Sequence, residues 1–292
     1  MITHLSASAS NLIDVNETVS TDVLVVGGGP AGSAAAIALA RSGRDVVLID
    51  RAAFPRDKCC GDGLTTLALR ELELLAFDPG TVDDWFEVDG ASLRSPSGRS
   101  VDVPLDGPGT YAAVAPRLQL DNALVELARA AGVDVRDGHG FESMIEHDDR
   151  IEVVADHLHI TTRYVVAADG MWSPVRKALG INEQGYLGEW HGFRQYGRGA
   201  TGTAAKQLHV WFEADLLPGY AWSFPLPNGR FNIGFGVLRG GEVKTKEMKQ
   251  LWLDLLERPH IVEALGADFE LEDRHTAWPI PARVDDAVLA RG

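Results

Sequence analysis

Apolar and polar positions alternate between strand-like and helix-like spacing in the first fifty residues. The apolar run Asp22–Val26 leads directly into glycines, which is typical of a buried parallel strand. An alanine-rich stretch, Ala31–Arg41, has helical composition, and Gly43 follows it as a stop signal. A second apolar run occupies Asp45–Asp50. This order of strand, helix and strand predicts a β-α-β unit within a parallel sheet.

Helical spacing returns twice further along the chain. It spans Leu64–Leu75 and Arg117–Ala131, and Gly132 ends the second stretch. Between them, Trp85–Val103 has the alternation of a meander of short strands around a Ser-Pro-Ser-Gly turn. A later apolar segment, Tyr164–Ala168, runs into Asp-Gly and predicts another strand of the parallel sheet.

The pattern changes from about Gly185. Strand-like segments alternate there with Pro- and Gly-rich turns, and they span Leu208–Phe212, Tyr220–Phe224 and Phe231–Val237. One helix is expected over Val243–Leu256. Successive strands without intervening helices predict an antiparallel sheet. The predicted fold class is therefore α/β, with a Rossmann-like parallel-sheet domain and an interwoven antiparallel-sheet domain.

The predicted domain boundaries follow these changes in pattern. Residues 1–20 are rich in Ser and Asn and have the composition of a disordered leader. Residues 21–184 form the Rossmann-like domain, except that the 85–104 meander contributes to the sheet of the other domain. The antiparallel domain spans residues 185–285.

The net charge of the chain limits the classes of molecule that it is expected to bind. The 292 residues include 42 acidic and 27 basic side chains, a formal net charge of −15. Nucleic-acid binding requires clustered Lys and Arg, so we expect no nucleic-acid partner. The chain also has no polybasic segment for anionic lipids, although a peripheral membrane contact through an apolar substrate pocket stays open.

The number of cysteines and the hydropathy of the chain indicate in which cellular compartment the protein is expected. The two cysteines, Cys59 and Cys60, are adjacent, which fits neither a disulfide framework nor metal-ligand spacing. The sequence has no run of about 18 apolar residues, and the leader lacks the basic start and apolar stretch of a signal peptide. We therefore expect a cytoplasmic protein with reduced thiols and no metal.

The turn after the first strand carries the strongest chemical signal. Its sequence contains G-x-G-x-x-G through Gly27, Gly29 and Gly32. These glycines permit a tight turn and a close approach of backbone N–H groups to a pyrophosphate, whose charge the helix dipole stabilises. Asp50 lies 18 residues beyond Gly32, at the end of the second strand, where it can accept hydrogen bonds from a ribose. The cofactor-binding residues predicted from this unit are Gly27, Gly29, Pro30, Ala31, Gly32, Asp50 and Arg51.

The segment after the Tyr164–Ala168 strand separates FAD from NAD. It reads Asp-Gly-Met-Trp-Ser-Pro-Val-Arg, and on this segment the chain resembles flavoproteins of the aromatic-hydroxylase fold, and within them the geranylgeranyl reductase family. In that fold the Asp-Gly segment lies along the FAD pyrophosphate. The resemblance implies FAD as the cofactor and Asp169, Gly170 and Arg176 on its side, whereas Asp-Gly in isolation is an ordinary turn.

Two further segments carry the resemblance. Phe54–Leu64 is similar to the family's F-P-R-x-K-x-C-G-D-G-L, whose cysteine falls on Cys60. Pro218–Pro225 resembles P-x-x-Y-x-W-x-F-P, with its leading proline one residue closer to the tyrosine. Asn232–Gly236 continues the match, so the resemblance covers roughly residues 22–281.

The first of these segments is expected beside the cofactor. By resemblance Cys60, Gly61 and Gly63 are cofactor-binding residues, because two glycines let the backbone approach a flat ring closely. A protonated thiol can also donate a proton, which makes Cys60 a candidate catalytic residue. The alternative for an isolated cysteine is a small buried hydrophobe.

The second segment places aromatic side chains on one strand face. Tyr220, Trp222 and Phe224 alternate, so all three point the same way. Such a face suits either a sheet core or the wall of an apolar pocket. By resemblance Tyr220 and Trp222 are expected in the pocket, as candidate catalytic residues, and Phe224 in the core.

Two expectations concern the rest of the cofactor site. Arg117 opens the predicted helix four residues before Asp121, and the resemblance places such an arginine near the cofactor phosphates; a solvated arginine is the alternative. Members of the fold also carry a third FAD segment, a strand followed by Gly-Asp. Residues 286–292 match only its start, so the resemblance implies a C-terminally truncated chain.

These features predict an FAD-dependent oxidoreductase of the geranylgeranyl reductase type. Reduced flavin, with NAD(P)H as the expected electron donor, delivers hydride to an isoprenoid C=C bond, and Cys60, Tyr220 or water supplies the proton. The expected partner is a prenyl-chain small molecule, without an obligate protein partner. A flavin-dependent monooxygenase or halogenase is the first alternative, because Tyr220–Pro225 is close to the W-x-W-x-I-P of halogenases. A truncated domain without catalytic activity is the second.

Overall fold

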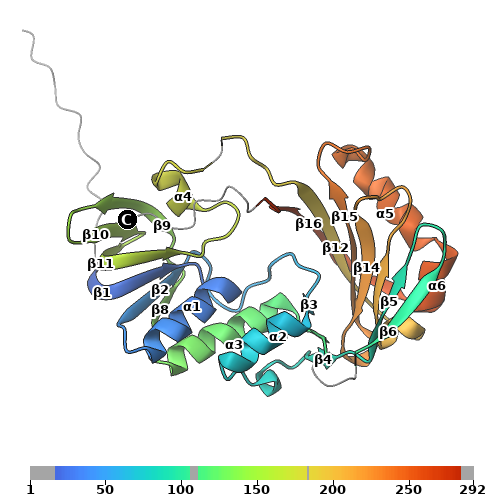
Figure 1. Ribbon diagram of the computed structural model, residues 1–292, viewed down its shortest axis with the longest axis horizontal. Coiled ribbons are helices and arrows are strands. Elements are labelled where there is room, and N and C mark those ends of the chain that lie inside the picture. Colours follow the sequence, from blue (N-terminus) through green and yellow to red (C-terminus); the bar gives the residue numbers. More distant parts are fainter. Residues whose placement is uncertain (1–16, 106–110, 183, 284–292) are drawn as a thin grey trace, which may run out of the picture. The chain divides into compact units, whose positions relative to one another are not determined.

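The computed structural model describes residues 17–105, 111–182 and 184–283 (Figure 1). These residues form two compact units, the first made of 17–53 and 128–180 and the second of 54–127 and 181–283. The chain enters each unit twice, so each unit joins segments that are far apart in the sequence. One unit contains a largely parallel sheet and the other a largely antiparallel sheet, and the predicted α/β fold class is confirmed.

A six-stranded sheet forms the first unit. Strands β8, β2, β1 and β11 run parallel in that order, and β10 and β9 extend the sheet as antiparallel neighbours. The strands are β1 (Glu17–Val26), β2 (Val46–Asp50), β8 (Asp134–Asp137), β9 (Phe141–Glu146), β10 (Ile151–Ala155) and β11 (Leu158–Ala167). Helices α1 (Pro30–Arg41) and α4 (Pro174–Ala178) belong to this unit.

The central strands of this sheet are buried, which explains their apolar sequences. Every residue of 23–26 in β1 and of 46–49 in β2 is buried, as expected for parallel strands covered on both faces. Leu24, Val26 and Ile49 share one cluster with apolar residues of β10 and β11. The β-α-β unit predicted from the first fifty residues is therefore present.

The first strand begins earlier than its apolar run. Residues 17–20, which the sequence pattern assigned to the disordered leader, belong to β1 and pair with residues 158–161 of β11. The β10–β11 hairpin offers an extended strand edge there, and β1 follows it with side chains that are mostly polar and exposed. Residues 1–16 lie outside the described residues.

Two sheets form the second unit. The larger has seven strands in the order β16, β12, β15, β14, β13, β5 and β6, and the smaller has the order β3, β7 and β4. The strands are β3 (Gly63–Leu64), β4 (Phe86–Glu87), β5 (Gly90–Arg94), β6 (Ser100–Pro104), β7 (Ala113–Val114), β12 (Trp190–Arg198), β13 (Leu208–Trp211), β14 (Tyr220–Pro225), β15 (Phe231–Leu238) and β16 (Glu270–Ile280).

Four further α-helices are described. They are α2 (Thr66–Leu74), α3 (Arg117–Ala130), α5 (Met248–Leu256) and α6 (Pro259–Leu265), with 3-10 turns at Pro79–Thr81, Thr203–Ala205, Pro227–Gly229 and Thr245–Glu247. The helix expected over Val243–Leu256 thus starts at Met248. Strands β12 and β16 and helix α6 had no clear signal in the sequence.

Contacts divide the chain differently from the predicted boundaries. The sequence pattern placed 21–184 in one domain, whereas residues 54–127 make their contacts within the second unit. Strand β5 pairs in parallel with β13, and β6 pairs with β5, so the predicted meander lies at one edge of the seven-stranded sheet. Pairing between strands more than a hundred residues apart leaves no local mark in the sequence.

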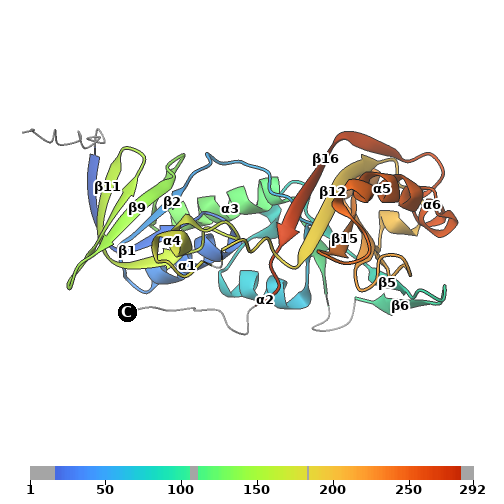
Figure 2. The same ribbon diagram turned by 90° about the horizontal axis from the view of Figure 1, so that it is seen from above.

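The two faces of the large sheet have different partners. Alternate residues of β15, from Phe231 to Val237, share a core with α5 and α6, which cover one face (Figure 2). Gly197 of β12 makes room there, because a Cβ at this position would lie 2.3 Å from Phe231 Cζ. The residues of β15 between them, including Asn232, face the other way, toward the segment that contains Cys60.

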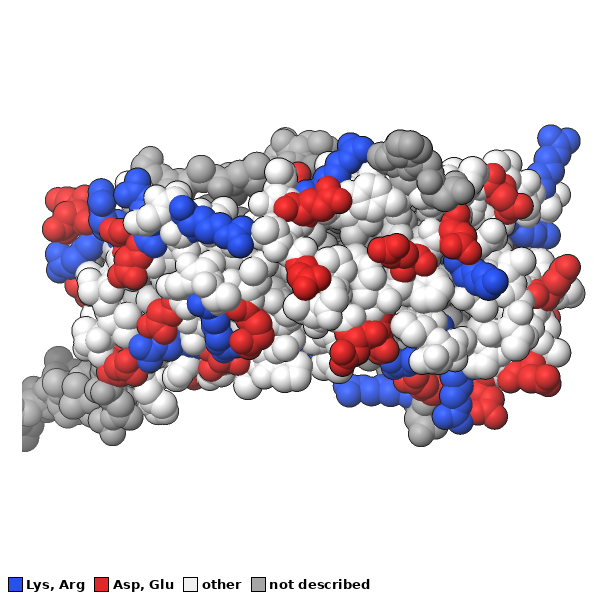
Figure 3. Space-filling model, turned by 90° about the horizontal axis from the view of Figure 1, so that it is seen from below, with Lys and Arg blue, Asp and Glu red and all other residues white. Residues whose placement is uncertain are grey.

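Charged side chains are mixed on the surface. Acidic and basic residues are interspersed on the face drawn in Figure 3, and the coloured basic residues there do not gather into an extended patch. Several arginines are paired with carboxylates, as in the bridges from Arg258 to Glu213 and Asp215, each with an N···O distance of 2.6 Å. Among the described helices, none combines the length and apolarity that a bilayer crossing requires.

Replacing Phe231 with alanine is expected to destabilise the second unit strongly. Its ring is fully buried and packs edge-on against Phe269. Phe231→Ala should lower the free energy of unfolding by about 3–5 kcal/mol, measured by urea denaturation. Val101→Ala, in the same sheet but 61% exposed, is the matched control and should cost less than about 0.5 kcal/mol. Equal losses in the two variants would contradict the assignment of Phe231 to the core.

Candidate active site

The glycines of the first turn are required by close backbone contacts. Gly27 has φ +107°, and a Cβ there would lie 2.4 Å from the carbonyl oxygen of Ala168 at the end of β11. A Cβ at Gly32 would lie 1.7 Å from the carbonyl oxygen of Gly27. Neither position accepts a side chain unless the backbone moves. The turn is therefore packed between the start of α1 and the end of β11.

The N-terminus of α1 is open to an anion. Gly29 is the N-cap residue and provides no side-chain cap, and Pro30 occupies the first turn, which carries no acidic residue. The N–H groups of the first helical turn, including those of Ala31 and Gly32, have no partner within the helix. Together with the helix dipole they suit a phosphate group.

Asp50 stabilises this turn and retains hydrogen-bond acceptor sites for a ligand. Its Oδ2 accepts a hydrogen bond from the Gly28 N–H at 2.7 Å, and its Oδ1 accepts one from the Ala52 N–H at 2.8 Å. An ionised carboxylate has about four acceptor sites, so each oxygen retains one for a ribose hydroxyl. The neighbouring Arg51, also predicted from the sequence, is exposed.

The Asp169-Gly170 segment lies beside Gly27. A Cβ at Gly27 would lie 2.9 Å from the Asp169 Cα, so the two motifs that were predicted to hold the cofactor are adjacent. The Asp169 Oδ2 accepts a hydrogen bond from the Val175 N–H at 3.1 Å, and Gly170 has φ +80°. Arg176 is turned back on this segment and donates to the Met171 carbonyl at 2.5 Å.

A buried carboxylate organises the Cys60 segment of the second unit. Asp62 is 2% exposed and has φ +65°. Its Oδ2 accepts hydrogen bonds from the Tyr196 hydroxyl at 2.5 Å and from Asn232 Nδ2 at 2.7 Å, and its Oδ1 accepts one from the Arg117 N–H at 3.3 Å. These bonds join the loop of residues 59–62, here called the Cys60 turn, to β12, to β15 and to the start of α3.

Burial has the largest effect on the pKa of the Asp62 carboxyl group. It raises the pKa of Asp62 to about 6, although the hydrogen bonds from Tyr196 and Asn232 act in the opposite direction. Burial and the neighbouring carboxylate also raise the pKa of Tyr196, so this phenol remains a donor. The guanidinium groups of Arg194 and Arg230 lie over the Tyr196 ring at 4.3 and 4.6 Å from its centroid.

The glycines next to Cys60 approach aromatic rings of the protein itself. A Cβ at Gly61 would lie 3.3 Å from Trp222 Nε1, and one at Gly63 would lie 2.8 Å from Phe224 Cε2. The sequence predicted these glycines as cofactor contacts that admit a flat ring. In the structure the rings that occupy this space are Trp222 and Phe224.

The three alternating aromatic residues of β14 share one face, as the sequence predicted. Neighbouring ring centroids are 6.2 Å apart for Tyr220 and Trp222 and 6.3 Å apart for Trp222 and Phe224. Burial increases along the strand from Tyr220, which is 42% exposed, to Trp222, which is 8% exposed. Phe224 contacts a buried cluster that includes Tyr196 and Leu226. Tyr220 therefore offers the accessible end of this face.

The charge of Arg117 is paired with a carboxylate on its own helix. Its Nε and Nη2 donate to both oxygens of the buried Asp121, at 2.6 and 2.8 Å, and Arg56 donates to the same carboxylate. Burial acts to lower the pKa of Arg117, but the Asp121 carboxylate raises it above its usual value. The Cys60 thiol also lies within interaction range of this guanidinium. The predicted phosphate contact thus competes with an internal ion pair.

The two cysteines have separate surroundings. The Cys59 Sγ donates to the Thr276 carbonyl at 3.8 Å, and burial raises the pKa of this thiol. Cys60, also half-buried, has its carbonyl oxygen bound by Asn232 Nδ2 at 2.9 Å. Nearby, the buried Arg194 donates to both oxygens of Asp57 at 3.0 Å.

A family model described as an FAD binding domain matches residues 20–197, which include the α1 turn, Asp50 and the Asp169 segment. The chain belongs to this family. FAD is thus confirmed as the cofactor of this flavoprotein, and the glycine turn with its uncapped helix fits the cofactor's pyrophosphate.

Relatives of this flavoprotein confirm the resemblance to geranylgeranyl reductases. A menaquinone reductase from Mycobacterium tuberculosis is 39% identical over 239 residues, covering 75% of this chain and 55% of the relative. A digeranylgeranylglycerophospholipid reductase from Methanopyrus kandleri is 31% identical over 256 residues, covering 85% and 62%. A geranylgeranyl bacteriochlorophyll reductase-like protein from Thermoplasma acidophilum shares the fold, with a TM-score of 0.75 and 23% identity over 89% of this chain and 66% of that one. The chain thus spans between about half and two thirds of their length.

Sequence reasoning missed the polar network of this flavoprotein. Asp62 lies within the Phe54–Leu64 segment, but the sequence assigned it no role. Tyr196 and Asn232 were not predicted as site residues. The available signal was a polar residue within an apolar strand, such as Asn232 between Phe231 and Ile233. A buried polar side chain must be hydrogen-bonded, so its position predicts a partner without identifying it.

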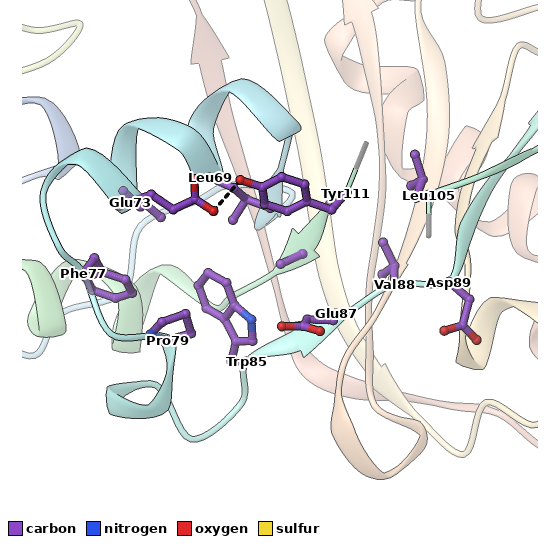
Figure 4. Close-up of a pocket in the computed structure, with 13 residues that line it drawn as sticks. Leu69, Glu73, Phe77, Pro79, Trp85, Glu87, Val88, Asp89, Leu105 and Tyr111 are labelled. Atoms are coloured by element: carbon purple, nitrogen blue, oxygen red, sulfur yellow. Dashed lines mark hydrogen bonds between the residues drawn. The ribbon is translucent and has the colours of Figure 1, made fainter. Parts of the chain in front are cut away.

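A cavity of about 560 Å³ lies elsewhere in the second unit, between α2 and the small sheet (Figure 4). Its wall is mostly apolar, and at one side the Tyr111 hydroxyl donates to Glu73 Oε1 at 2.6 Å. The lining residues are Leu69, Leu72, Glu73, Phe77, Pro79, Trp85, Glu87, Val88, Asp89, Leu105, Tyr111, Ala112 and Ala113. None of them is a predicted site residue.

Adding one methyl group to the first turn should weaken FAD binding. Because a Cβ at position 32 collides with the Gly27 carbonyl, Gly32→Ala must displace the turn. We expect a loss of about 2–3 kcal/mol, or roughly 100-fold in the Kd for FAD, measured by fluorescence titration. Ala38→Ser, at an exposed position of the same helix, should leave the Kd unchanged. An unaltered Kd in Gly32→Ala would contradict the tight packing of this turn.

The buried Asp62 should make stability depend on pH. Its folded-state pKa of about 6 is above the ordinary value of 3.8, so the folded chain holds an extra proton between these values. The stabilisation is fully present below about pH 4 and is lost as the pH rises through 6, on the order of 3 kcal/mol. The free energy of unfolding, measured by urea denaturation across this pH range, should fall by this amount in the original chain relative to Asp62→Asn. The contributions of the other carboxylates are the same in both proteins and cancel in the difference. Parallel pH profiles would refute the raised pKa.

Proposed function

We propose that the chain provides the FAD-binding and substrate-binding parts of a reductase that saturates C=C bonds of an isoprenoid chain. The main support is the aromatic face of β14, with Tyr220 accessible and Trp222 buried, set beside the Cys60 turn in the second unit. An apolar, methyl-branched chain is the type of ligand that a row of aromatic side chains accommodates. The relatives support the same substrate class, because menaquinone and digeranylgeranylglycerophospholipid both carry isoprenoid chains.

The residues of the first unit are suited to hold FAD. The uncapped N–H groups at the start of α1 would bind the pyrophosphate, and the Asp50 carboxylate, which already accepts from the Gly28 N–H, would accept hydrogen bonds from the adenosine ribose. When bound, FAD supplies hydride to one carbon of the alkene. NAD(P)H is the proposed source of reducing equivalents.

The remaining tasks belong to side chains of the second unit. The aromatic face excludes water from the chain it binds and orients one double bond. The half-buried Cys60 thiol holds the proton for the second alkene carbon, and Tyr220 is the other donor on this side of the sheet. The bidentate Arg117–Asp121 pair fixes a guanidinium whose charge interacts with Cys60.

The proposal predicts alkene reduction without oxygen. The chain, loaded with FAD and reduced chemically under anaerobic conditions, should add two hydrogen atoms to each reduced bond of a prenylated quinone or a geranylgeranyl lipid, measured by mass spectrometry. The saturated phytanyl compound is the control and should remain unchanged. A product that forms only in air and contains added oxygen or halogen would favour a monooxygenase or halogenase. A folded chain that retains no FAD would contradict the proposal and would favour a domain without catalytic activity.

The adjacent cysteines provide a matched test of the proton donor. Cys60→Ser should lower kcat roughly 100-fold, because a serine hydroxyl is a far weaker acid, while the KM for the prenyl compound changes little. Cys59→Ser removes the thiol that bonds the Thr276 carbonyl and should retain activity within about twofold. If the two variants have the same kcat, the proton comes from Tyr220 or water, and Tyr220→Phe decides between them.

A further inference from the structure

Asn232 lies fully buried where three parts of the second unit meet. It sits on β15 between Tyr196 of β12 and Phe224 of β14, its partners in the register of the sheet. Its side chain makes three hydrogen bonds. Oδ1 accepts one from Trp222 Nε1 at 3.1 Å, and Nδ2 donates to the Cys60 carbonyl at 2.9 Å and to Asp62 Oδ2 at 2.7 Å.

These partners admit only one kind of side chain. The indole N–H of Trp222 can only donate, whereas the Cys60 carbonyl and the Asp62 carboxylate can only accept. The central residue must therefore present one acceptor and two donors within a short reach, as a primary amide does. An aspartate has no donor for either acceptor. An aliphatic residue leaves the Trp222 N–H and the Cys60 carbonyl without this partner, at about 1–3 kcal/mol each, and removes one of the donors to Asp62. The same requirement fixes the orientation of the amide.

The hydrogen bonds connect two features that the proposed reaction uses. Trp222 belongs to the aromatic face, and its ring closes against Gly61. Cys60 carries the thiol, and its backbone is bound through Asn232 and, one step further, through Asp62 and Tyr196. The hydrogen bonds of the Asn232 side chain among the described residues go to the Trp222 indole, the Cys60 carbonyl and Asp62, so we argue its effect through these neighbours.

We propose that Asn232 is a positioning residue that holds the Cys60 turn and the Trp222 indole in one fixed relation. Asp62 is its partner in this task, because its carboxylate binds the amide and the turn together. The positioning role depends only on contacts within the second unit. Its effect on turnover rests on the proposed reductase function.

The first test measures the turn without any assay of activity. In a Cys59→Ser background, Cys60 is the single thiol, and its rate of labelling by N-ethylmaleimide reports how firmly the turn is held. Asn232→Asp removes both donors and places two carboxylates side by side, so labelling should accelerate about tenfold or more. Ser223→Ala is the matched control: this buried residue of β14 has no hydrogen-bond partner among the described residues, and labelling should stay within twofold.

A reciprocal exchange tests the pairing itself. In Asp62→Asn combined with Asn232→Asp, the new amide donates to the new carboxylate, which still accepts from Trp222. The exchange thus restores the pairing between positions 62 and 232 and removes the repulsion between two carboxylates, whereas the bond to the Cys60 carbonyl stays lost. Labelling in this double variant should fall several-fold below that in Asn232→Asp alone. Additive effects, or an Asn232→Asp rate equal to that of Ser223→Ala, would overturn the proposal. If Asn232→Asp does not fold, recovery of folding in the double variant is the same test, and its absence counts against the pairing.

Turnover separates this inference from the proposed function. If the original chain reduces prenyl compounds, Asn232→Asp should lower kcat at least tenfold, with KM changed less than threefold and with FAD still bound, and the exchange should recover part of kcat. If the original chain reduces none of them, the reductase proposal fails, while the labelling series still decides the role of Asn232. An active original chain with unchanged kcat in Asn232→Asp would refute the effect on turnover.

Discussion

A charged group that is removed from water must find its hydrogen-bond partners inside the protein, and Asp62 imposes this constraint on the second unit. Its carboxylate is buried, with a phenol, an amide and a backbone N–H directed at its oxygens. These donors come from β12, β15 and the start of α3. Because two of these donors lie on strands from the C-terminal half of the chain, the carboxylate joins those strands to a turn near residue 60.

The same turn shows how two constraints combine. The glycines on either side of Asp62 allow Trp222 and Phe224 to pack against the backbone, so the aromatic face of β14 and the turn form one packed layer. A buried polar network specifies a geometry more sharply than apolar packing, since a small shift breaks several bonds at once.

The cofactor turn of the first unit depends on close packing of the backbone. Gly27 and Gly32 lie so near carbonyl oxygens of β11 and of the turn itself that any side chain would collide. Helix α1 begins without a side-chain cap, and its first N–H groups remain for a phosphate. Here the sequence was informative because each requirement is local: a strand, three glycines, a helix and an acidic residue at a set spacing.

The sequence alone determined the β-α-β unit, the Gly27–Gly32 turn, Asp50 and the shared face of Tyr220 and Trp222, because these depend on neighbours within a few residues or on the alternation along one strand. It also indicated the family through short segments of matching residues. The tertiary structure decided the rest. It assigned residues 54–127 to the second unit, paired Arg56 with Asp121, filled the space beside Gly61 with Trp222, and joined Asp62 to Tyr196 and Asn232. Such pairings connect residues separated by up to 170 positions, and their partners are chosen by burial and hydrogen-bond complementarity rather than by any local pattern.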